Sequence, residues 1–441
     1  MVISGRLGCP YGCEAPIGVF LWGRGDLRKR LNYGSTPYLE RGVASEEEEP
    51  DMPVYDVVVV GGGNLGLWTA YRLARRGFGR VAVLERGWAG GGATSRSAGV
   101  VRQQGGSETA ARLGKLSREL YLSLGDELGL DSGFTETGYY IVAETEEEKK
   151  GFLRLIDVRR GAGVENEWVE PEEGRRRFPD LAWDRFVGAT YTADDGYVHP
   201  PIAARNATCA VLSEEAVDLF EMCEVLGIEE RGDHYAIETA GDLFEAERVV
   251  DAGGPRGAHE VGAMAGVEVP VMAVRHQIVT FPVIDGMHPF PLVFNVGKGY
   301  YWRPEEQGAL LGMSNPVDEA DTSGRYQISF DWDYYEKLRP DWESAHPALA
   351  GMPVSRAWAA SIDYTPDHLP IIDQPKGGFY VLAAGGHGMM WGPALGETMA
   401  RLISEGTLGD LTKEDVELAR FSRERDPGRL EDAIALPFPK K

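Results

Sequence analysis

The strongest hydrophobic pattern in the chain is a run of four valines at residues 57–60, which leads directly into a glycine-rich turn. A β-branched run that is apolar on both faces predicts a central strand of a parallel sheet covered by helices. Gly61, Gly63 and Gly66 follow with the spacing G-x-G-x-x-G, and a helical pattern continues over residues 67–76. The first glycine permits a tight turn, the second lets a pyrophosphate approach the backbone, and the third lets the helix pack closely on the strand. The pattern therefore predicts a dinucleotide at the N-terminus of this helix.

A second predicted strand, residues 80–85, ends on Glu85, at about the twenty-residue distance from the glycine turn that such folds use for an acid. A carboxylate there can accept hydrogen bonds from a ribose, or it can be an ordinary acid at the end of a strand. The complete succession of strand, turn, helix, strand and acid favours the dinucleotide.

Residues 87–102 contain mainly glycine, alanine and hydroxyl side chains, a composition that favours neither a helix nor a strand. Such a stretch is either a flexible linker or backbone that lies against a flat ligand. Two arginines, Arg96 and Arg102, and a predicted helix at residues 107–125 favour contact with a ligand.

The remaining pattern predicts that the parallel sheet is interrupted by an insertion and then resumed. Strands are expected at residues 138–143, 187–191, 216–225, 246–251 and 378–384, and helices at residues 145–160 and 394–405. We expect Pro393 to open the last of these helices, because proline suits a first helical turn. Alternating residues predict an antiparallel sheet that can cover the cofactor, with strands at 271–281, 299–304 and 309–312.

These patterns predict an α/β fold, in which a Rossmann-type domain carries an inserted α+β substrate domain built on an antiparallel sheet. The expected nucleotide-binding domain is discontinuous and comprises residues 52–135, 196–265 and 355–405. The substrate domain would comprise residues 136–195 and 266–354, and a tail would follow at 406–441. Residues 1–51 show no period of 2 or 3.6, so we expect either an irregular arm that the core does not need or a native start at Met52.

Composition excludes several classes of partner. The formal net charge of −24 repels nucleic acid and anionic lipid, and no run of apolar residues is long enough for a transmembrane helix, so we expect a cytoplasmic protein. Four cysteines are too few for a disulfide framework. Cys9 and Cys13 have no second ligand pair nearby, so we expect no metal site.

Taken together, these residues resemble the D-amino-acid-oxidase-like superfamily of FAD-dependent oxidoreductases. The resemblance covers residues 54–403 and is greatest for the branch of sarcosine oxidases, dimethylglycine dehydrogenases and dye-linked proline dehydrogenases. Besides the fingerprint with Glu85, its landmarks are residues 93–102, 195–200, 249–254, 301–304, 365–372 and 386–388. These landmarks are specific for the superfamily and much less so for the substrate.

The resemblance implies that FAD is the cofactor and indicates its binding residues. Glu85 would bind the adenosine ribose, the backbone of Val225 would meet the adenine, and Gly253 would lie near the ADP half. Residues 94–101 and 386–390 would bracket the flavin. The residues expected at the cofactor are Gly61, Gly63, Asn64, Leu65, Gly66, Glu85, Arg86, Thr94, Ser95, Ser97, Ala98, Gly99, Val100, Val101, Val225, Gly253, Gly254, Gly386, His387, Gly388, Met389 and Met390.

The resemblance also implies catalytic positions, each with a plainer alternative. Arg102 would receive a substrate carboxylate beside the flavin, unless it is a surface charge at the start of the next helix. Tyr301 and Arg303 would close the pocket from the antiparallel sheet, although Tyr301 could equally be packing. His387 either takes part in the chemistry or orders its loop. Met390 stands where some relatives have a lysine that holds the carboxylate or reacts with oxygen.

Residues 359–361 lack the cysteine through which some relatives bond the flavin, so we expect non-covalent FAD. The implied reaction is oxidation of a small amino acid or secondary amine, such as L-proline or sarcosine, by hydride transfer to flavin N5. The electrons would pass to a dye, a quinone or oxygen, and a homo- or hetero-oligomer is possible. The alternatives are a dehydrogenase of 2-hydroxy acids or glycerol phosphate, and a flavin subunit of a larger electron-transfer complex.

Overall fold

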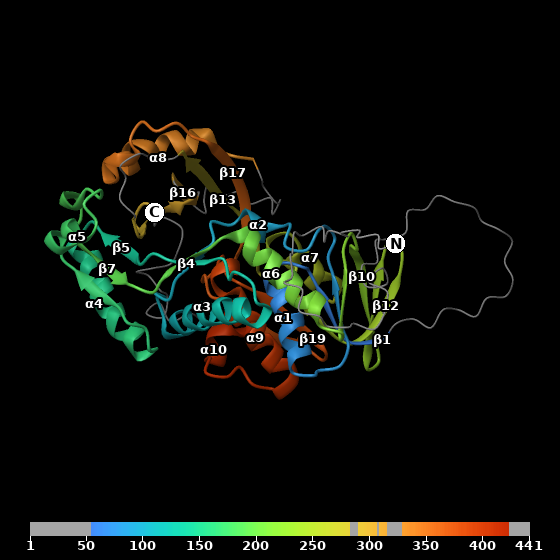
Figure 1. The fold of residues 1–441 in the computed structure, drawn as a ribbon. Helices are drawn as coiled ribbons and strands as arrows, with labels where there is room; N and C mark the ends of the chain where they lie inside the picture. The colour runs from blue at the N-terminus through green and yellow to red at the C-terminus, as the bar shows by residue number, and fades with distance from the viewer. Residues whose placement is uncertain (1–53, 283–289, 307, 315–328, 423–441) are drawn as a thin grey trace, which may run out of the picture.

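The structure is a computed structural model, and it describes residues 54–282, 290–306, 308–314 and 329–422. The predicted arm at residues 1–51, the Cys9/Cys13 pair and the end of the predicted tail lie outside the described residues. Two large sheets, each with helices packed against it, make up most of the described chain (Figure 1).

The first sheet has eight strands and is built around the predicted valine strand. Strand β1 pairs in parallel with β12 and β2, β2 pairs in parallel with β9, and β12 pairs in parallel with β19. The predicted parallel core is therefore confirmed. The eight strands of the whole first sheet are β1 (Val54–Val60), β2 (Val81–Leu84), β9 (Val217–Phe220), β10 (Val225–Arg231), β11 (His234–Thr239), β12 (Leu243–Asp251), β18 (Ile371–Lys376) and β19 (Phe379–Ala383).

Both faces of this sheet are covered, as the valine run predicts. Val57 and Val59 pack in a core with α1, α3, α6 and α9, whereas Val58 and Val60 pack in another core with α7 and the β10–β11 hairpin. All four valines are buried. The helices are α1 (Asn64–Arg75), α3 (Glu108–Leu128), α6 (Pro200–Ser213), α7 (Gly254–Met264) and α9 (Gly388–Glu405).

The prediction of a single strand at residues 216–225 is wrong. The chain leaves β9 at Phe220, and Met222 adopts a positive φ of 55°. The backbone N–H of Met222 donates to the carbonyl of Gly87 at 2.9 Å, and that of Cys223 donates to the carbonyl of Glu85 at 2.8 Å. These bonds turn the chain across the end of β2, so β10 begins as part of an antiparallel hairpin. Alternation alone does not reveal such a turn.

The prediction that Pro393 opens the last helix is also wrong, because α9 begins at Gly388 and Pro393 lies inside it. Proline has no N–H to donate to the carbonyl of Met389 one turn earlier. Instead, the hydroxyl of Tyr121 donates to this carbonyl at 2.7 Å, and the next N–H, that of Ala394, donates to Ser117 Oγ at 3.1 Å. Two side chains of α3 thus replace the interrupted hydrogen bonds of α9.

The second sheet has eight strands in the order β17-β13-β16-β15-β14-β5-β7-β6. The strands predicted at residues 271–312 are antiparallel to their neighbours, as expected, but the sheet is mixed because β14 and β5 pair in parallel. Its strands are β5 (Tyr139–Ala143), β6 (Glu167–Val169), β7 (Gly188–Thr192), β13 (Met272–Phe281), β14 (Leu292–Asn295), β15 (Tyr300–Glu305), β16 (Gly308–Ser314) and β17 (Arg356–Tyr364).

Helices α4 (Glu146–Gly161), α5 (Pro171–Arg177) and α8 (Trp332–Ala345) lie beside this second sheet (Figure 1). The predicted helix at residues 145–160 is confirmed as α4, and Thr145 and Glu148 form a capping box at its start. Strand β17 pairs with β13 and so belongs to the second sheet by hydrogen bonding, although its residues fall in the range predicted for the nucleotide-binding domain. The domain ranges themselves stay a prediction.

A third sheet, smaller than the other two, has three strands. It consists of β3 (Val100–Val101), β8 (Gly196–Val198) and β4 (Phe134–Glu136). The small-residue stretch thus ends in a short strand, and it also contains the one-turn helix α2 (Ala93–Arg96). The prediction that this stretch has neither helix nor strand is wrong for these residues. Beyond α9, the described part of the predicted tail contains α10 (Lys413–Val416).

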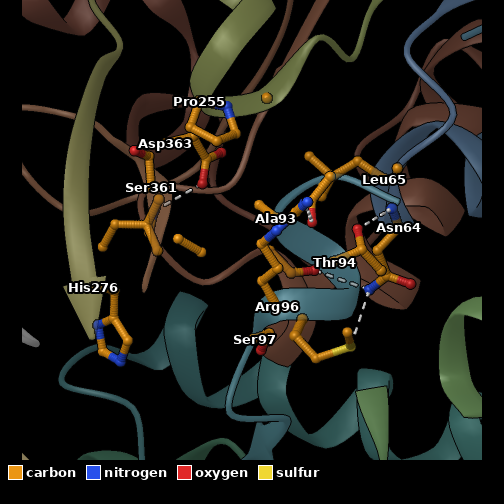
Figure 2. Close-up of a pocket in the computed structure, with 18 of the residues that line it drawn as sticks. Asn64, Leu65, Ala93, Thr94, Arg96, Ser97, Pro255, His276, Ser361 and Asp363 are labelled. Carbon is orange, nitrogen blue, oxygen red and sulfur yellow. Dashed lines mark hydrogen bonds between the residues drawn. The ribbon is translucent and has the colours of Figure 1, made fainter. Parts of the chain in front are cut away.

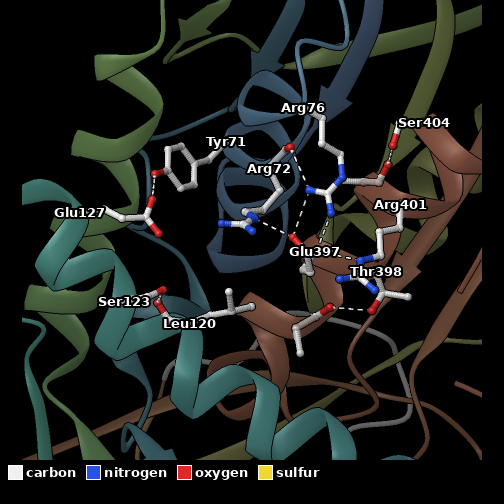
Figure 3. Close-up of polar contacts among 12 residues, drawn as sticks. Tyr71, Arg72, Arg76, Leu120, Ser123, Glu127, Glu397, Thr398, Arg401 and Ser404 are labelled. Carbon is white, nitrogen blue, oxygen red and sulfur yellow. Dashed lines mark hydrogen bonds and ion pairs between the residues drawn. The ribbon is translucent and has the colours of Figure 1, made fainter. Parts of the chain in front are cut away.

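Helices α1 and α9 cross with little space between them. A Cβ atom added at Gly396 would lie 2.5 Å from Trp68 Cβ, and one added at Gly392 would lie 2.2 Å from Asn64 Nδ2. Directly after Gly396, the buried carboxylate of Glu397 on α9 bonds to arginines of α1. It accepts hydrogen bonds from Arg72 at 2.6 Å and Arg401 at 2.9 Å, and it also pairs with Arg76 (Figure 3).

This cluster predicts how stability depends on pH. Burial raises the pKa of Glu397, but hydrogen bonds and charges from Arg76 and Arg72 outweigh burial and lower the pKa to about 2. A carboxyl group with a depressed folded-state pKa stabilises the fold above its unfolded pKa, and this stabilisation is lost as the pH falls toward 2. The shift corresponds to about 3 kcal/mol. Glu397→Gln should therefore lower the free energy of unfolding at pH 7 by about that amount and flatten its fall between pH 4.5 and 2.

The matched control is Glu405→Gln. Glu405 also pairs with Arg76, but its side chain is 52% exposed, so this variant should change little. Urea titrations of both variants across this pH range provide the measurement. Equal effects of the two substitutions would show that the buried cluster does not stabilise the α1–α9 contact.

Candidate active site

A cavity of about 570 Å³ lies between the first and second sheets, a size typical of a ligand site. Its walls come from the N-terminus of α1, the small-residue stretch, the turn after β12, the second sheet and the loop before α9. Figure 2 shows Asn64 and Thr94 on one side and His276, Ser361 and Asp363 on the other. The predicted site residues that line it are Gly61, Gly63, Asn64, Leu65, Glu85, Arg86, Thr94, Ser97, Ala98, Val100, Arg102, Gly253, Gly254, Tyr301, Gly386, His387, Gly388, Met389 and Met390.

The three fingerprint glycines have different steric surroundings, and each requires or allows the lack of a side chain for a different reason. Gly61 has a φ of 113°, and a Cβ atom on it would lie 2.4 Å from the carbonyl oxygen of Ala252. A Cβ atom on Gly66 would lie 1.9 Å from the carbonyl oxygen of Gly61, so this glycine allows the helix to pack on the turn. At Gly63 the nearest atom to an added Cβ is Thr94 Oγ1 at 3.4 Å, so the space beside this residue belongs to the cavity.

The start of α1 is suited to an anion. Helix α1 has no hydrogen bond from a side-chain cap and no acidic residue in its first turn. The N–H of Asn64 donates to Thr94 Oγ1 at 3.0 Å, which ties the helix to the small-residue stretch. The positive end of a helix dipole at an open glycine is what a pyrophosphate requires.

Glu85 is held at the end of β2 by two backbone donors. The N–H of Gly62 donates to Oε2 at 2.7 Å, and the N–H of Gly87 donates to Oε1 at 2.7 Å. Both bonds fix the carboxylate at the cavity wall, where it can accept from ribose hydroxyls. Open space at Gly63, the uncapped helix and this acid together fit the ADP half of FAD.

The loop before α9 forms the other end of the cavity. Asp363 on β17 accepts hydrogen bonds from the N–H groups of Ala384 at 2.5 Å and Gly386 at 3.3 Å, and burial raises its pKa to about 6. Asn64 Nδ2 donates to the carbonyl of Gly388 at 2.9 Å and to Tyr121 Oη at 2.8 Å. The two predicted cofactor segments, at the starts of α1 and α9, are thus hydrogen-bonded to each other.

The ring of His387 is buried in this loop. Its Nδ1 lies 3.0 Å from the carbonyl oxygen of Gly385, and the ring stacks on Trp391 with 4.1 Å between centroids. Burial lowers the pKa of His387 well below its usual value, and the charge of Arg102 lowers it further. A neutral, stacked imidazole orders the loop and also lines the cavity.

Arg102 is 3% exposed and lines the cavity, so the alternative of a surface charge is wrong. Its guanidinium carbon lies 5.9 Å from the ring centroid of Tyr139 and 5.8 Å from that of Phe294. The next residue, Gln103, donates its N–H to the buried carboxylate of Asp195 at 2.8 Å. Two aromatic rings and this backbone anchor hold the arginine at the cavity wall.

His276, which the sequence analysis did not identify, also lines the cavity. His276 Nε2 is 2.6 Å from the hydroxyl of Tyr301, and His276 Nδ1 is 2.7 Å from Ser314 Oγ. Burial lowers the pKa of His276 to about 4 and raises that of Tyr301, so both groups are neutral near pH 7. Both line the cavity, and a role of Tyr301 beyond packing stays a prediction.

Several predicted site residues do not line the cavity. Arg303 donates through Nε to the carbonyl of Ala98 at 2.7 Å, pairs with Glu305 at 2.6 Å and lies over the ring of Tyr197, so it braces the small-residue stretch from behind. The expectation that Arg303 closes the pocket is wrong. The predicted residues outside the lining are Gly66, Ser95, Gly99, Val101, Val225 and Arg303.

The cavity residues that the sequence analysis missed fall into more than one group. One group, which includes Glu224, Pro255 and Arg256, lies in the segments before β10 and after β12. Another group sits in strands of the second sheet, where neighbours in space are far apart in sequence. For His276, the signal that could have pointed to it is the polar run of Arg275, His276 and Gln277 within a mostly apolar strand. The others in this sheet include Tyr139, Phe294, Ser361 and Asp363.

Among the residues that the structure describes, no group of three or more His, Cys, Asp and Glu side chains could hold a metal ion. Within the same residues, no helix has the length and hydropathy of a membrane span.

A parallel sheet whose glycine turn opens into a long cavity at a helix N-terminus defines a dinucleotide-binding fold. The model of the family described as FAD dependent oxidoreductase matches residues 56–402, so the chain belongs to this family. FAD is therefore its cofactor, as the sequence predicts.

Three proteins illustrate what this chain is similar to. Mitochondrial sarcosine dehydrogenase of Mus musculus is 28% identical over 83% of this chain, but the match covers 42% of that protein, so the chain spans less than half its length. Sarcosine oxidase subunit beta of Arthrobacter sp is 30% identical, with coverage of 86% of this chain and 93% of that one. The solved L-proline dehydrogenase of P. horikoshii has a TM-score of 0.77 and 29% identity, with coverage of 83% and 98%.

The glycine turn predicts a contrast between two substitutions. Gly63→Val puts a side chain into cavity space, so the protein should fold but lose FAD, which a flavin-to-protein absorbance ratio measures. Gly66→Val forces a side chain against the Gly61 carbonyl and should lower the yield of folded protein. A Gly63→Val protein that keeps its full flavin content would show that the pyrophosphate lies elsewhere.

Proposed function

We propose that the protein catalyses the FAD-dependent oxidation of a small amino acid or secondary amine, with L-proline and sarcosine as the model substrates. The observation that carries this proposal is the buried guanidinium of Arg102 in the wall of the same cavity that holds Tyr301 and the loop before α9. A buried arginine favours a ligand with a carboxylate, because its fork can donate two parallel hydrogen bonds to one.

The side chains around Arg102 would strengthen this interaction. Tyr139, Phe294, Tyr301 and Met390 present aromatic and thioether surfaces to the cavity. Ion pairing is stronger where such walls keep water away. His276 and His387 are neutral near pH 7, so neither would repel the arginine or compete for the carboxylate.

The neutral Tyr301–His276 pair would face the amine end of the substrate. An oxidisable amine must be unprotonated at the moment of reaction, with its proton released to solvent. A neutral Tyr301–His276 pair would not hold the amine in its charged form, because it has no negative charge to pair with an ammonium. When bound, FAD supplies the acceptor for the hydride from the carbon next to the nitrogen, and water hydrolyses the imine product. The protein contributes the orientation of the carboxylate and an uncharged environment at the amine.

The activities for which the relatives are named support this class of substrate. Sarcosine dehydrogenase, sarcosine oxidase subunit beta and L-proline dehydrogenase are all named for secondary amino acids. Because this chain spans less than half of the mouse sarcosine dehydrogenase, the activity, substrate and partners of the whole protein stay proposals. The name of the Arthrobacter relative makes a hetero-oligomer a reasonable second proposal, in which this chain is a flavin subunit of a larger complex.

We also propose non-covalent FAD and a preference for dye or quinone acceptors over oxygen. The cavity lining contains no cysteine among the described residues, and Met390 occupies the position where some relatives carry a lysine. Acid precipitation should therefore release intact FAD into the supernatant, and flavin that stays on the denatured chain would contradict the proposal.

The same arginine could bind the carboxylate of a 2-hydroxy acid, which is the main alternative. Anaerobic mixing with a panel of amines, amino acids, 2-hydroxy acids and glycerol phosphate separates the two, because bleaching of the flavin absorbance reports the substrate directly. We expect bleaching by L-proline, sarcosine or a related N-alkyl amino acid. Bleaching by hydroxy acids alone would exclude oxidation of amines.

Arg102→Ala tests the residue on which the proposal rests. Loss of one partner of a buried charge pair costs roughly 3–5 kcal/mol, so the apparent affinity for substrate should fall by about two to three and a half orders of magnitude. The FAD content should stay near that of the wild type. The control is Arg112→Ala, which removes a surface arginine paired with Glu108 on α3. Stopped-flow reduction provides the measurement, and an unchanged substrate dependence in Arg102→Ala would remove this residue from the site.

A further inference from the structure

The register of the second sheet places a glycine at the centre of the cavity wall. Tyr301 on β15 pairs with Gly312 on β16, and Gly312 pairs with Ile278 on β13. His276 and its partner Ser314 lie two residues further along the same two strands. Since side chains two residues apart share a face, Tyr301, His276, Ser314 and the position of Gly312 all face the same side of the sheet.

No side chain other than hydrogen fits at this position. A Cβ atom on Gly312 would lie 2.1 Å from Tyr301 Cζ and 2.3 Å from its hydroxyl oxygen. The tyrosine ring therefore lies flat over the glycine instead of standing away from the sheet. Gly312 has no positive φ, so any residue could adopt its backbone conformation. Glycine is required here because the Tyr301 ring occupies the space of a side chain.

The flat ring explains how Tyr301 reaches its partner. Strands β15 and β13 are separated by β16, which corresponds to about 9–10 Å between their backbones. A tyrosine that stood perpendicular to the sheet could not span this distance. Because the ring crosses β16 at the glycine, its hydroxyl comes within 2.6 Å of His276 Nε2.

The rest of the arrangement holds the ring in this one position. Phe294 packs edge-on against Tyr301 from β14 with 5.9 Å between centroids, and the His276 ring stacks on it at 5.7 Å. Ser314 Oγ fixes the other ring nitrogen of His276 at 2.7 Å. The hydroxyl of Tyr334 on α8 in turn donates to the Ser314 carbonyl at 2.7 Å.

We propose that Gly312 is a positioning residue for the substrate site, because its lack of a side chain allows Tyr301 to lie across β16 and bond to His276. This inference rests on the proposed function, in which Tyr301 and His276 face the amine. It predicts that any larger residue at position 312 displaces the ring, breaks the bond to His276 and changes the shape of the substrate end without touching the FAD residues.

The test is a double-mutant cycle with Gly312→Ala, Tyr301→Ala and the double variant. Gly312→Ala should keep its FAD, and its rate of anaerobic flavin reduction or its apparent substrate affinity should fall about tenfold, as expected when one buried hydrogen bond is lost. In the Tyr301→Ala background the same substitution should have no further effect, because the ring that it meets is gone. Gly227→Ala on β10 is the control, since an added Cβ there lies 3.4 Å from the nearest atom, Glu238 Oε2.

Melting temperatures of the same variants need no substrate and keep the two proposals distinguishable. Gly312→Ala should lower the melting temperature when Tyr301 is present and not when it is replaced by alanine. Additive effects of the two substitutions, in stability or in kinetics, would overturn the role of Gly312. So would wild-type kinetics of Gly312→Ala. If no amine reduces the wild-type flavin while the stability cycle shows coupling, the proposed function fails and the steric contact stands.

Discussion

The close approach of α1 and α9 is the constraint on which the rest of the site depends. Glycines at 392 and 396 let α9 lie directly against Asn64 and Trp68 of α1, at separations that a single methyl group would prevent. The N-termini of both helices consequently meet at one cavity. One terminus opens on the glycine turn and the other on the loop 386–390, so backbone N–H groups and helix dipoles of two elements serve one elongated cofactor.

This arrangement requires an irregular helix, and α3 compensates for it. Pro393 interrupts the hydrogen bonds of α9 one turn after its start, and Tyr121 and Ser117 of α3 supply the missing donor and acceptor. Tyr121 also accepts from Asn64, so the repair connects all three helices at the cavity. The second sheet then closes the cavity, with Asp363 of β17 holding the loop before α9 and Tyr301 facing it from β15.

Most residues expected at the nucleotide half line the cavity, because the signals that identified them are local. The valine run, the glycine spacing and Glu85 are contiguous or nearly so, and each specifies its own geometry. The substrate half depends on strand register, which brings Tyr301, Gly312 and His276 together from three strands. Alternation predicts a strand but not the strands beside it, so His276 was missed. Arg303 was expected to line the cavity, but it donates instead to the carbonyl of Ala98 in the small-residue stretch. The same limit explains why the position of Pro393 inside α9 was not predicted. The side chains that compensate for its missing N–H lie about 270 residues earlier in the chain.

The central claim is that FAD and a carboxylate-bearing amine meet between the loop before α9 and the wall formed by Arg102 and Tyr301. A crystal structure of the FAD-bound protein with tetrahydrofuran-2-carboxylate, which resembles proline but has no oxidisable amine, tests it most directly. The carboxylate should pair with the guanidinium of Arg102, and the ring oxygen should face Tyr301 and His276. A carboxylate bound elsewhere, with Arg102 turned away from it, would contradict this arrangement of the site.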